Sequence, residues 1–215
     1  MFENITWDFS GMEIERESFR RIEAEADRSK WNDKEWPVAR RLIHTTADFT
    51  IADTLKLRHN PVDAGIEALY KGVPLYSDSN MIRSGISVPK LQKFNSAYTR
   101  ESITCLVADP EITAIAKEQN ITRALAAVRK AKDIIDGGIF LCGNAPLALA
   151  GLIKMIVEEG IRPALIIGMP VGFVNVVESK ELLRKVDIPH ITIEGRRGGS
   201  PLAVATLHAI MESEL

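Results

Sequence analysis

Cysteine is scarce in this 215-residue sequence, which contains only Cys105 and Cys142. Each lies inside an apolar run, and the chain has no Cys-x-x-Cys or His-x-x-x-His pair of the kind that holds a structural metal. We therefore expect two buried free thiols in a reducing compartment rather than a disulfide, and no metal site.

Long apolar runs and an excess of charge are missing as well. No run approaches the roughly 18 residues that a membrane span needs, and the acidic first eight residues lack the positive and apolar segments of a signal peptide. Lysine and arginine total 27 against 29 aspartates and glutamates, a net charge of −2, so no overall basic field favours nucleic acid. We expect a cytoplasmic protein whose partners include neither a membrane nor a nucleic acid.

The residues that are present are typical of a globular protein, with 46% hydrophobic and 26% charged side chains. The first third of the chain predicts helices, over 15–30, from an Asp33 cap through Leu42, and from Pro61 to Gly72. Because no linker or repeat divides the sequence, we expect residues 1–215 to form a single domain, with a helical N-terminal part (1–72) and a parallel α/β part (73–215).

After Gly72 the pattern changes to short apolar runs that alternate with helical stretches. Five runs predict buried strands, at 74–77, 103–108, 139–142, 164–167 and 190–193. The clearest helical stretches between them are 122–135, 145–158 and 201–212. Buried strands that alternate with helices indicate a parallel sheet covered on both faces. We predict a flavodoxin-like, three-layer α/β/α fold with a five-stranded sheet.

In such a sheet, ligands bind beyond the carboxyl ends of the strands, and four of the five loops there are rich in Gly, Asn, Ser or Arg. Gly143 and the pair Gly198-Gly199 each precede a helix whose first N–H groups are expected to be unpaired and able to bind an anion. The dinucleotide and nucleoside-triphosphate glycine motifs are absent, which argues against those ligands. Several separated anion sites suit a large ligand with many carboxylates. For any one loop, ordinary strand ends and helix caps explain the glycines equally well.

A second group of residues is Arg40-Arg41-Leu42-Ile43-His44. On a helix both arginines share a face with His44, whose imidazole can serve as a general acid or base near neutral pH. The alternative is a solvated basic stripe with an incidental histidine. The remaining histidines are predicted to be structural: His59, His190 and His208. The arginines are expected to gather at one mouth of the fold: Arg40, Arg41, Arg83, Arg196 and Arg197.

The motifs together closely resemble the precorrin-8X methylmutase (cobalt-precorrin-8 methylmutase) family, from about Glu17 to the last helix. The matching segments are Arg40–Phe49, Asp78–Ile86, Thr122-Arg123, Gly143–Pro146, Arg162–Ala164, Gly168–Val174, Glu178–Lys180 and Gly195–Ser200. Ser87 after Ile86 and Met169 are mild departures from the family pattern, and neither lies in the catalytic motif.

The resemblance implies an isomerase of cobalamin biosynthesis that is a homodimer without a cofactor. It would move a methyl group from C-11 to C-12 of ring C, converting precorrin-8X to hydrogenobyrinate or its cobalt analogue to cobyrinate. In the family, the histidine of the Arg-x-x-His motif is the proton donor and acceptor, here His44, and the substrate contacts fall on Arg41 and Ser18. Loop residues complete the expected substrate-binding set: Asn80, Arg83, Asn144, Gly172, Arg196, Gly199 and Ser200.

Two other functions remain open from the sequence. One is a corrinoid carrier that hands the product to the next enzyme of the pathway, and the other is a nucleotide- or sugar-phosphate-binding enzyme on the same fold. The motifs are common to enzymes of the metal-free and the cobalt-containing branches, and they leave open whether two subunits share a site.

Overall fold

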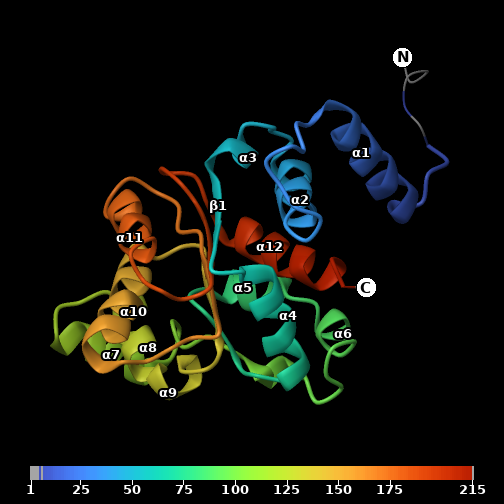
Figure 1. Cartoon of the computed structure of the whole chain (residues 1–215). Helices are drawn as coiled ribbons and strands as arrows, with labels where there is room; N and C mark the ends of the chain where they lie inside the picture. The colour runs from blue at the N-terminus through green and yellow to red at the C-terminus, as the bar shows by residue number, and fades with distance from the viewer. Residues whose placement is uncertain (1–4, 6, 215) are drawn as a thin grey trace.

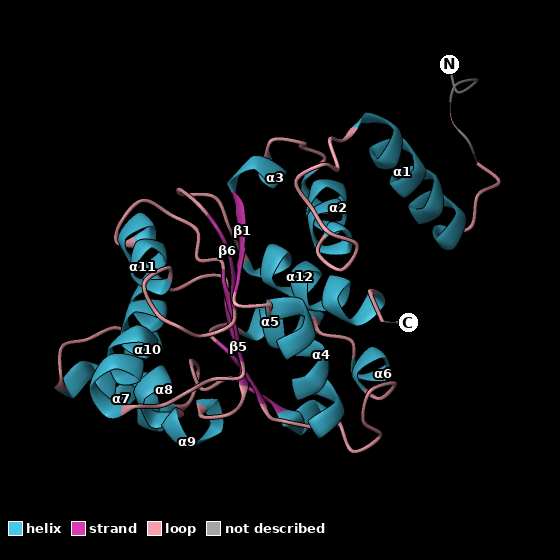
Figure 2. Ribbon diagram, in the orientation of Figure 1, coloured by secondary structure: helices cyan, strands magenta, loops and turns pink. Residues whose placement is uncertain are grey.

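The structure, a computed structural model, describes residue 5 and residues 7–214. Its centre is one six-stranded sheet in the order β1-β6-β5-β4-β2-β3. Figure 2 shows this sheet edge-on between two groups of helices. Five strands run parallel, and each comes from one of the five predicted apolar runs. They are β2 (Leu75–Ser77), β3 (Ile103–Thr104), β4 (Ile139–Cys142), β5 (Leu165–Gly168) and β6 (His190–Ile193). The prediction of an α/β protein built on parallel strands is confirmed.

The sixth strand, β1 (Leu55–Arg58), corrects the expectation of five strands. It pairs antiparallel with β6 at the edge of the sheet, with Leu55 opposite Ile193 and Arg58 opposite His190. Its sequence alternates Leu-Lys-Leu-Arg, because one side of an edge strand meets solvent, and so it forms no continuous apolar run. Residues 1–72 were predicted to be a helical part, and this part therefore contains one strand as well.

The central strands are buried on both faces, and successive side chains serve two different hydrophobic clusters. Ile139 and Leu141 of β4 join the larger cluster, whereas Phe140 and Cys142 join the smaller one on the opposite face. This is the period of two that a strand imposes on its side chains. A strand flanked by two cores reads as a continuous apolar run, which is why these strands are visible in the sequence.

Helices lie on both faces of the sheet (Figures 1 and 2). One face carries α7 (Pro110–Glu118), α8 (Arg123–Lys130), α9 (Lys132–Ile135), α10 (Pro146–Glu159) and α11 (Val176–Leu183). The other carries α2 (Trp36–Thr46), α4 (Pro61–Lys71), α5 (Asn80–Gly85), α6 (Val88–Leu91) and α12 (Ser200–Glu212). Outside these, α1 (Gly11–Glu25) lies next to α2, α3 (Ile51–Thr54) leads into β1, and a 3₁₀ turn (Arg100–Ser102) leads into β3.

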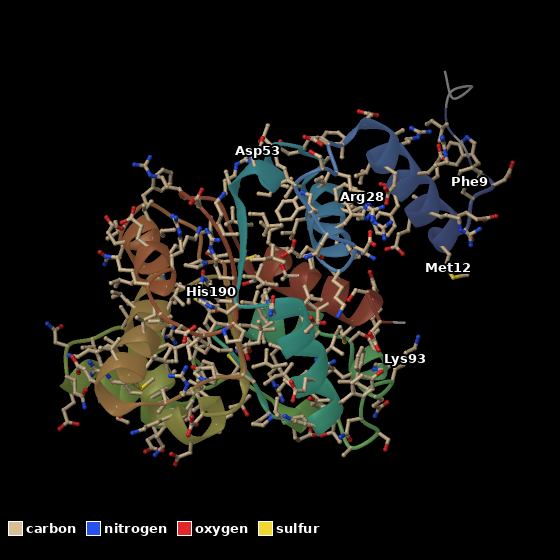
Figure 3. The ribbon with its side chains drawn as sticks, in the orientation of Figure 1. Phe9, Met12, Arg28, Asp53, Lys93 and His190 are labelled. Carbon is tan, nitrogen blue, oxygen red and sulfur yellow. The ribbon has the colours of Figure 1, made fainter. Side chains whose placement is uncertain are left out.

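The ends of the first two helices differ from the predicted ones for local reasons. Helix α1 begins before residue 15 because Ser10 and Glu13 form a capping box. The residue before α2 is Glu35 rather than Asp33, and its side chain makes no cap. Asp33 instead forms an ion pair with Arg28, which Figure 3 labels beside this part of the chain.

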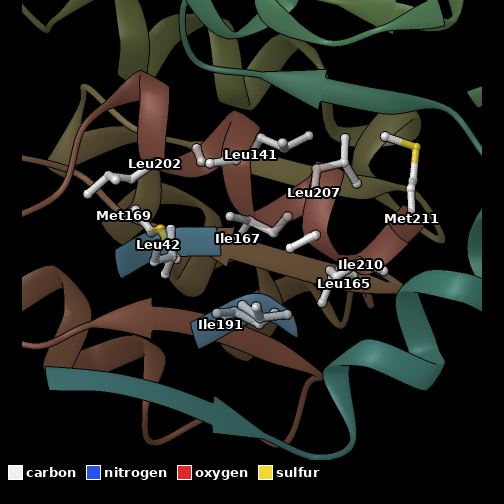
Figure 4. Close-up of a cluster of buried hydrophobic side chains, with 14 of the residues drawn as sticks. Leu42, Leu141, Leu165, Ile167, Met169, Ile191, Leu202, Leu207, Ile210 and Met211 are labelled. Carbon is white, nitrogen blue, oxygen red and sulfur yellow. The ribbon is translucent and has the colours of Figure 1, made fainter. Parts of the chain in front are cut away.

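Helix α12 is the most deeply buried helix on the face of the sheet that also carries α2, α4, α5 and α6. Its residues Leu202, Leu207 and Ile210 pack toward Leu141, Leu165 and Ile167 of the sheet (Figure 4). Leu42 of α2 is completely buried in the same cluster, so α2 lies on the outer side of α12. By contrast, Ile22 is the one fully buried side chain of α1.

No helix formed by residue 5 and residues 7–214 is long and apolar enough to cross a membrane. The prediction that the chain has no signal peptide rested on its first eight residues. Of these, residues 1–4 and 6 lie outside the described residues.

We predict that Gly198→Ala destabilises the fold. A Cβ at this position would lie 2.3 Å from the carbonyl oxygen of Met169 and 2.5 Å from that of Pro170. We expect the free energy of unfolding, measured with urea and circular dichroism, to fall by about 1–3 kcal/mol. Gly11→Ala is the control, because no atom lies within 4 Å of its added Cβ. Equal losses in the two variants would contradict the packing argument.

Candidate active site

A cleft of about 570 Å³ opens between α2, α5 and α12. Figure 1 shows these three helices on the same face of the sheet. Helices α5 and α12 follow β2 and β6, so the cleft lies beyond the carboxyl ends of parallel strands, where a ligand site was predicted. Its lining residues are Arg41, His44, Thr45, Met81, Gly85, Ser200, Pro201, Val204, Ala205 and His208.

His44 enters the cleft from the last turn of α2. Its Nδ1 lies 2.8 Å from the hydroxyl of Ser18 on α1, and the ring of Phe19 meets it edge to face at 5.2 Å. A hydroxyl can donate to the Nδ1 of a neutral imidazole or accept from that of an imidazolium. Ser18 can therefore hold His44 in both protonation states and leave Nε2 for the cleft.

Arg41 lies beside His44, but its charge is already paired within the chain. Its Nη1 is 2.6 Å from Glu15 of α1, and its Nη2 donates to Glu212 of α12. Burial lowers the pKa of Arg41, but its hydrogen bonds to these two carboxylates outweigh that effect and raise it overall. With its side chain only 12% exposed, Arg41 is a fixed cation in the wall of the cleft.

The prediction that five arginines gather at one mouth is wrong, because among the five Arg41 is the one that lines the cleft. The other four have partners of their own within the described chain. Arg40 pairs with Glu23 at 2.7 Å, and Arg83 donates through Nε to the carbonyl of Ile103 at 2.9 Å.

Arg197 pairs with Asp48 at 2.6 Å, whereas Arg196 lies 5.3 Å from the centre of the exposed Phe173 ring. Each of these acceptors is distant in sequence from its arginine. Residue spacing along the chain therefore contained no sign of the pairing.

The N-terminus of α10, predicted to bind a ligand anion, is occupied by the buried carboxylate of Asp78. Its two oxygens accept from the backbone N–H groups of Gly143, Asn144 and Ala145 at 3.1, 2.8 and 2.7 Å. These donors are consequently unavailable to a ligand. Asp78 instead ties the loop after β2 to the loop after β4.

The start of α12 does border the cleft. The hydroxyl of Ser200 lies 2.9 Å from that of Ser79, and the N–H of Gly199 donates to the carbonyl of Met169 at 2.9 Å. Gly199 has a φ of 127°, which favours glycine. Ser200 therefore lies in the wall of the cleft, with its hydroxyl paired to that of Ser79 and the backbone before it held by the carbonyl of Met169.

The predicted site residues thus fall into three groups. Those that line the cleft are His44, Arg41 and Ser200. Those directly next to a lining residue, in space or in sequence, are Ser18, Asn80 and Gly199. Those outside the lining are Arg83, Asn144, Gly172 and Arg196.

His208, predicted to be structural, lines the same cleft as His44. It lies on α12 at positions four and eight residues after Val204 and Ser200, so the three share one helix face. That spacing was the available signal. The other two histidines lie elsewhere: His59 is 3.1 Å from Asp187, and His190 is buried with its Nδ1 2.8 Å from the carbonyl of Ile188 (Figure 3).

Lys180 is a buried cation in a segment that matches the family pattern but was given no role from the sequence. Its Nζ donates to the carbonyls of Gly195 and Arg197 at 2.9 and 2.5 Å, and burial lowers its pKa to about 8. It thereby holds the loop that leads into α12.

Both cysteines are free, Cys142 buried and Cys105 half-buried. In residue 5 and residues 7–214, no group of three or more His, Cys, Asp or Glu side chains is placed to hold a metal ion.

Comparison with known proteins decides the family. The family model described as CbiC, precorrin-8X methylmutase, matches residues 13–213. The chain belongs to the precorrin-8X methylmutase family. The resemblance inferred from the motifs is confirmed.

Individual relatives of this family match over nearly their whole length. The cobalt-precorrin-8 methylmutase of Leptospira interrogans is 41% identical over 209 residues, with 94% of this chain and 93% of that protein covered. The protein of the same name from Methanocaldococcus jannaschii is 41% identical, with 85% and 81% covered. The solved precorrin-8x methyl mutase of Thermus thermophilus superposes with a TM-score of 0.85 at 43% identity, with 94% and 95% covered.

We predict that Asp78→Asn weakens the methylmutase fold, because an amide has one acceptor oxygen where the carboxylate has two. A buried N–H group left unpaired costs about 1–3 kcal/mol, and we expect a loss of that size in urea unfolding. Asp109→Asn is the matched control: Asp109 caps α7 through one N–H at 2.8 Å, and asparagine caps helices equally well. A similar loss in both variants would show that Asp78 has no special role.

Proposed function

We propose that this chain moves a methyl group from C-11 to C-12 of precorrin-8X or cobalt-precorrin-8, with His44 as the proton donor and acceptor. Membership of the methylmutase family places the chain in cobalamin biosynthesis as an isomerase. The observation that carries the assignment of His44 is its pairing with Ser18 at the wall of the cleft between α2, α5 and α12.

The chemistry suits a single imidazole. A methyl shift within a conjugated ring leaves the molecular formula unchanged, so the step has no net demand for electrons. A proton given to the macrocycle by His44 changes its electron distribution and favours migration, and the same proton returns to His44 afterwards. General acid–base catalysis of this kind contributes about 10²–10⁴-fold. Holding the ring in the reactive geometry supplies the rest.

Substrate carboxylates are proposed to contact Arg41, Ser200 and Gly199, with Ser18 and Asn80 at the rim. Arg41 is free to bind a substrate carboxylate once one of its internal partners moves. Glu15 is the easier partner to displace, because its side chain is 46% exposed against 29% for Glu212.

Four further substrate contacts are proposed with less support from the geometry: Arg83, Asn144, Gly172 and Arg196. These residues lie outside the cleft lining, and Arg83 and the backbone of Asn144 already have partners. Their support is the match of their loops to the family motifs.

The finer points of architecture are part of the proposal. Without β1, the parallel strands follow the order second-first-third-fourth-fifth, which supports a flavodoxin-like three-layer fold. One hydrophobic cluster draws on both 1–72 and 73–215, which supports a single domain. The exposed side chains of Phe173 and Val174 support a homodimer, and two free thiols support a cytoplasmic location.

We predict that His44→Ala loses turnover but still binds product. Adding precorrin-8X or cobalt-precorrin-8 to the wild-type protein should change the absorbance spectrum as product forms, and the variant should do so at least about 100-fold more slowly. The control is His59→Ala, since His59 is outside the cleft. Turnover by His44→Ala at the wild-type rate would remove His44 as the acid. Slow release of product by the wild type would add the carrier role.

We predict a smaller effect for Ser18→Ala, because it removes the partner of His44 and leaves the imidazole in place. The expected result is a fall in kcat of about tenfold with little change in product affinity, which corresponds to one lost hydrogen bond of about 1.4 kcal/mol. Ser10→Ala, which removes a capping hydroxyl on the same helix, controls for α1 stability. If both variants lose the same activity, Ser18 acts only through the helix.

A further inference from the structure

His208 occupies the cleft without a role in the function proposed above. It projects from α12 two turns after Ser200 and lines the same cavity as His44. Its ring is held by one hydrogen bond, which the backbone N–H of Ser87 donates to Nε2 over 3.2 Å.

This contact determines where the proton of His208 lies. A backbone N–H can only donate, so Nε2 must accept, and the single proton of the neutral ring is on Nδ1. Burial lowers the pKa of His208 to about 4; Lys90 and Arg41 act in the same direction and Glu212 against it. The ring is therefore neutral at physiological pH, with Nδ1–H as its one donor.

Nδ1 of His208 has no hydrogen-bond partner among the described residues. Nδ1 is also not one of the side-chain nitrogen and oxygen atoms that are fully buried without a hydrogen-bond partner. Since the ring lines the cleft, this N–H is accessible from the cavity. The contrast with His44 is chemical: the hydroxyl partner of His44 permits two protonation states, whereas the N–H partner of His208 permits one.

We propose that His208 binds the substrate as a donor of fixed tautomer, its Nδ1–H bonding a carboxylate oxygen on one arm of the macrocycle. This inference rests on the proposed function, which supplies a flat ring with acetate and propionate arms. The apolar wall formed by Val204 and Ala205 suits the ring, and a polar donor beside such a wall orients the ligand.

The charges around His208 favour an anion as its partner. Lys90 of α6 and Arg41 of α2 face it, and both are bound to the one carboxylate of Glu212 on α12. Glu15 of α1 balances Arg41 from the far side, and its side chain is half-exposed. When a substrate displaces Glu15, two cations remain beside a single internal carboxylate, and a carboxylate arm restores the balance.

Two substitutions separate the two nitrogens of the ring. In His208→Asn, the side-chain NH₂ takes the place of Nδ1–H, and the reach to Ser87 is lost. In His208→Gln, the amide oxygen takes the place of Nε2 and still accepts from Ser87, but no donor remains at the Nδ1 position.

We expect His208→Gln to raise KM for the methylmutase reaction and the Kd for cobyrinate by about tenfold, with kcat within about threefold of wild type. His208→Asn, which keeps a donor at the Nδ1 position, should raise both constants less than His208→Gln does. The opposite order, in which Gln is normal and Asn is impaired, would mean that His208 only supports Ser87 and would overturn the proposal. Equal impairment or equal normality of the two variants would also overturn it.

The wild-type protein distinguishes this inference from the proposed function. If it neither turns over precorrin-8X and cobalt-precorrin-8 nor binds cobyrinate, both proposals fall. If the wild type does turn over these substrates and His208→Gln binds cobyrinate normally, only the role of His208 falls.

Nitrogen-15 NMR of the histidine side chains tests the tautomer in the wild-type protein. We expect Nδ1 of His208 to carry the proton and its signal to shift when cobyrinate binds. A proton on Nε2 would refute the fixed tautomer.

Discussion

The N-terminus of α12 approaches the ends of β4 and β5 so closely that residues 143 and 198 have no room for a side chain. A Cβ on Gly143 would lie 2.6 Å from the backbone of Ser200, and one on Gly198 would meet the carbonyl of Met169. This contact sets where α12 starts. Its inner face is then buried on the sheet and its outer face supports α2. The cleft is the space left between these helices, so its shape follows from one backbone approach.

Local sequence patterns were enough to predict most of the fold but only part of the site. Four of the five parallel strands were visible because all their residues are buried and each reads as an apolar run. The fifth, β3 at the other sheet edge, keeps only Ile103 and the half-buried Thr104 of its predicted run 103–108. β1 was not visible, because Lys56 and Arg58 break its pattern at the sheet edge. His44 was found through its motif. His208 was missed because its importance depends on α12 lying beside α2, which is a tertiary fact that no local pattern contains.

The positions of the arginine charges likewise depend on tertiary contacts that the sequence pattern does not contain. Their residue types predicted a basic mouth, but four of the five guanidinium groups have an acceptor that lies far away in sequence, such as Glu212 for Arg41 and Asp48 for Arg197. Asp78 shows the same effect for an anion site. Its carboxylate accepts hydrogen bonds from backbone N–H groups that were expected to bind an anionic ligand. Four of the five arginines thus have hydrogen-bonded partners within the chain, and under the proposed function a charged ligand would bind by exchanging partners. Preorganisation of this kind lowers the ordering cost of binding.

Helix α1 carries Ser18 and Glu15 but buries only Ile22 completely. Its other links to the rest of the chain are polar contacts and the partly buried Phe19 beneath two guanidinium groups. Segments with little buried apolar surface open at free energies far below that of global unfolding. Ser18, the hydrogen-bond partner of His44, therefore lies on a helix with little buried apolar surface, whereas His44, Ser200 and His208 lie on helices that pack into the main hydrophobic cluster. The geometry of the Ser18–His44 pair thus depends on how α1 docks against α2.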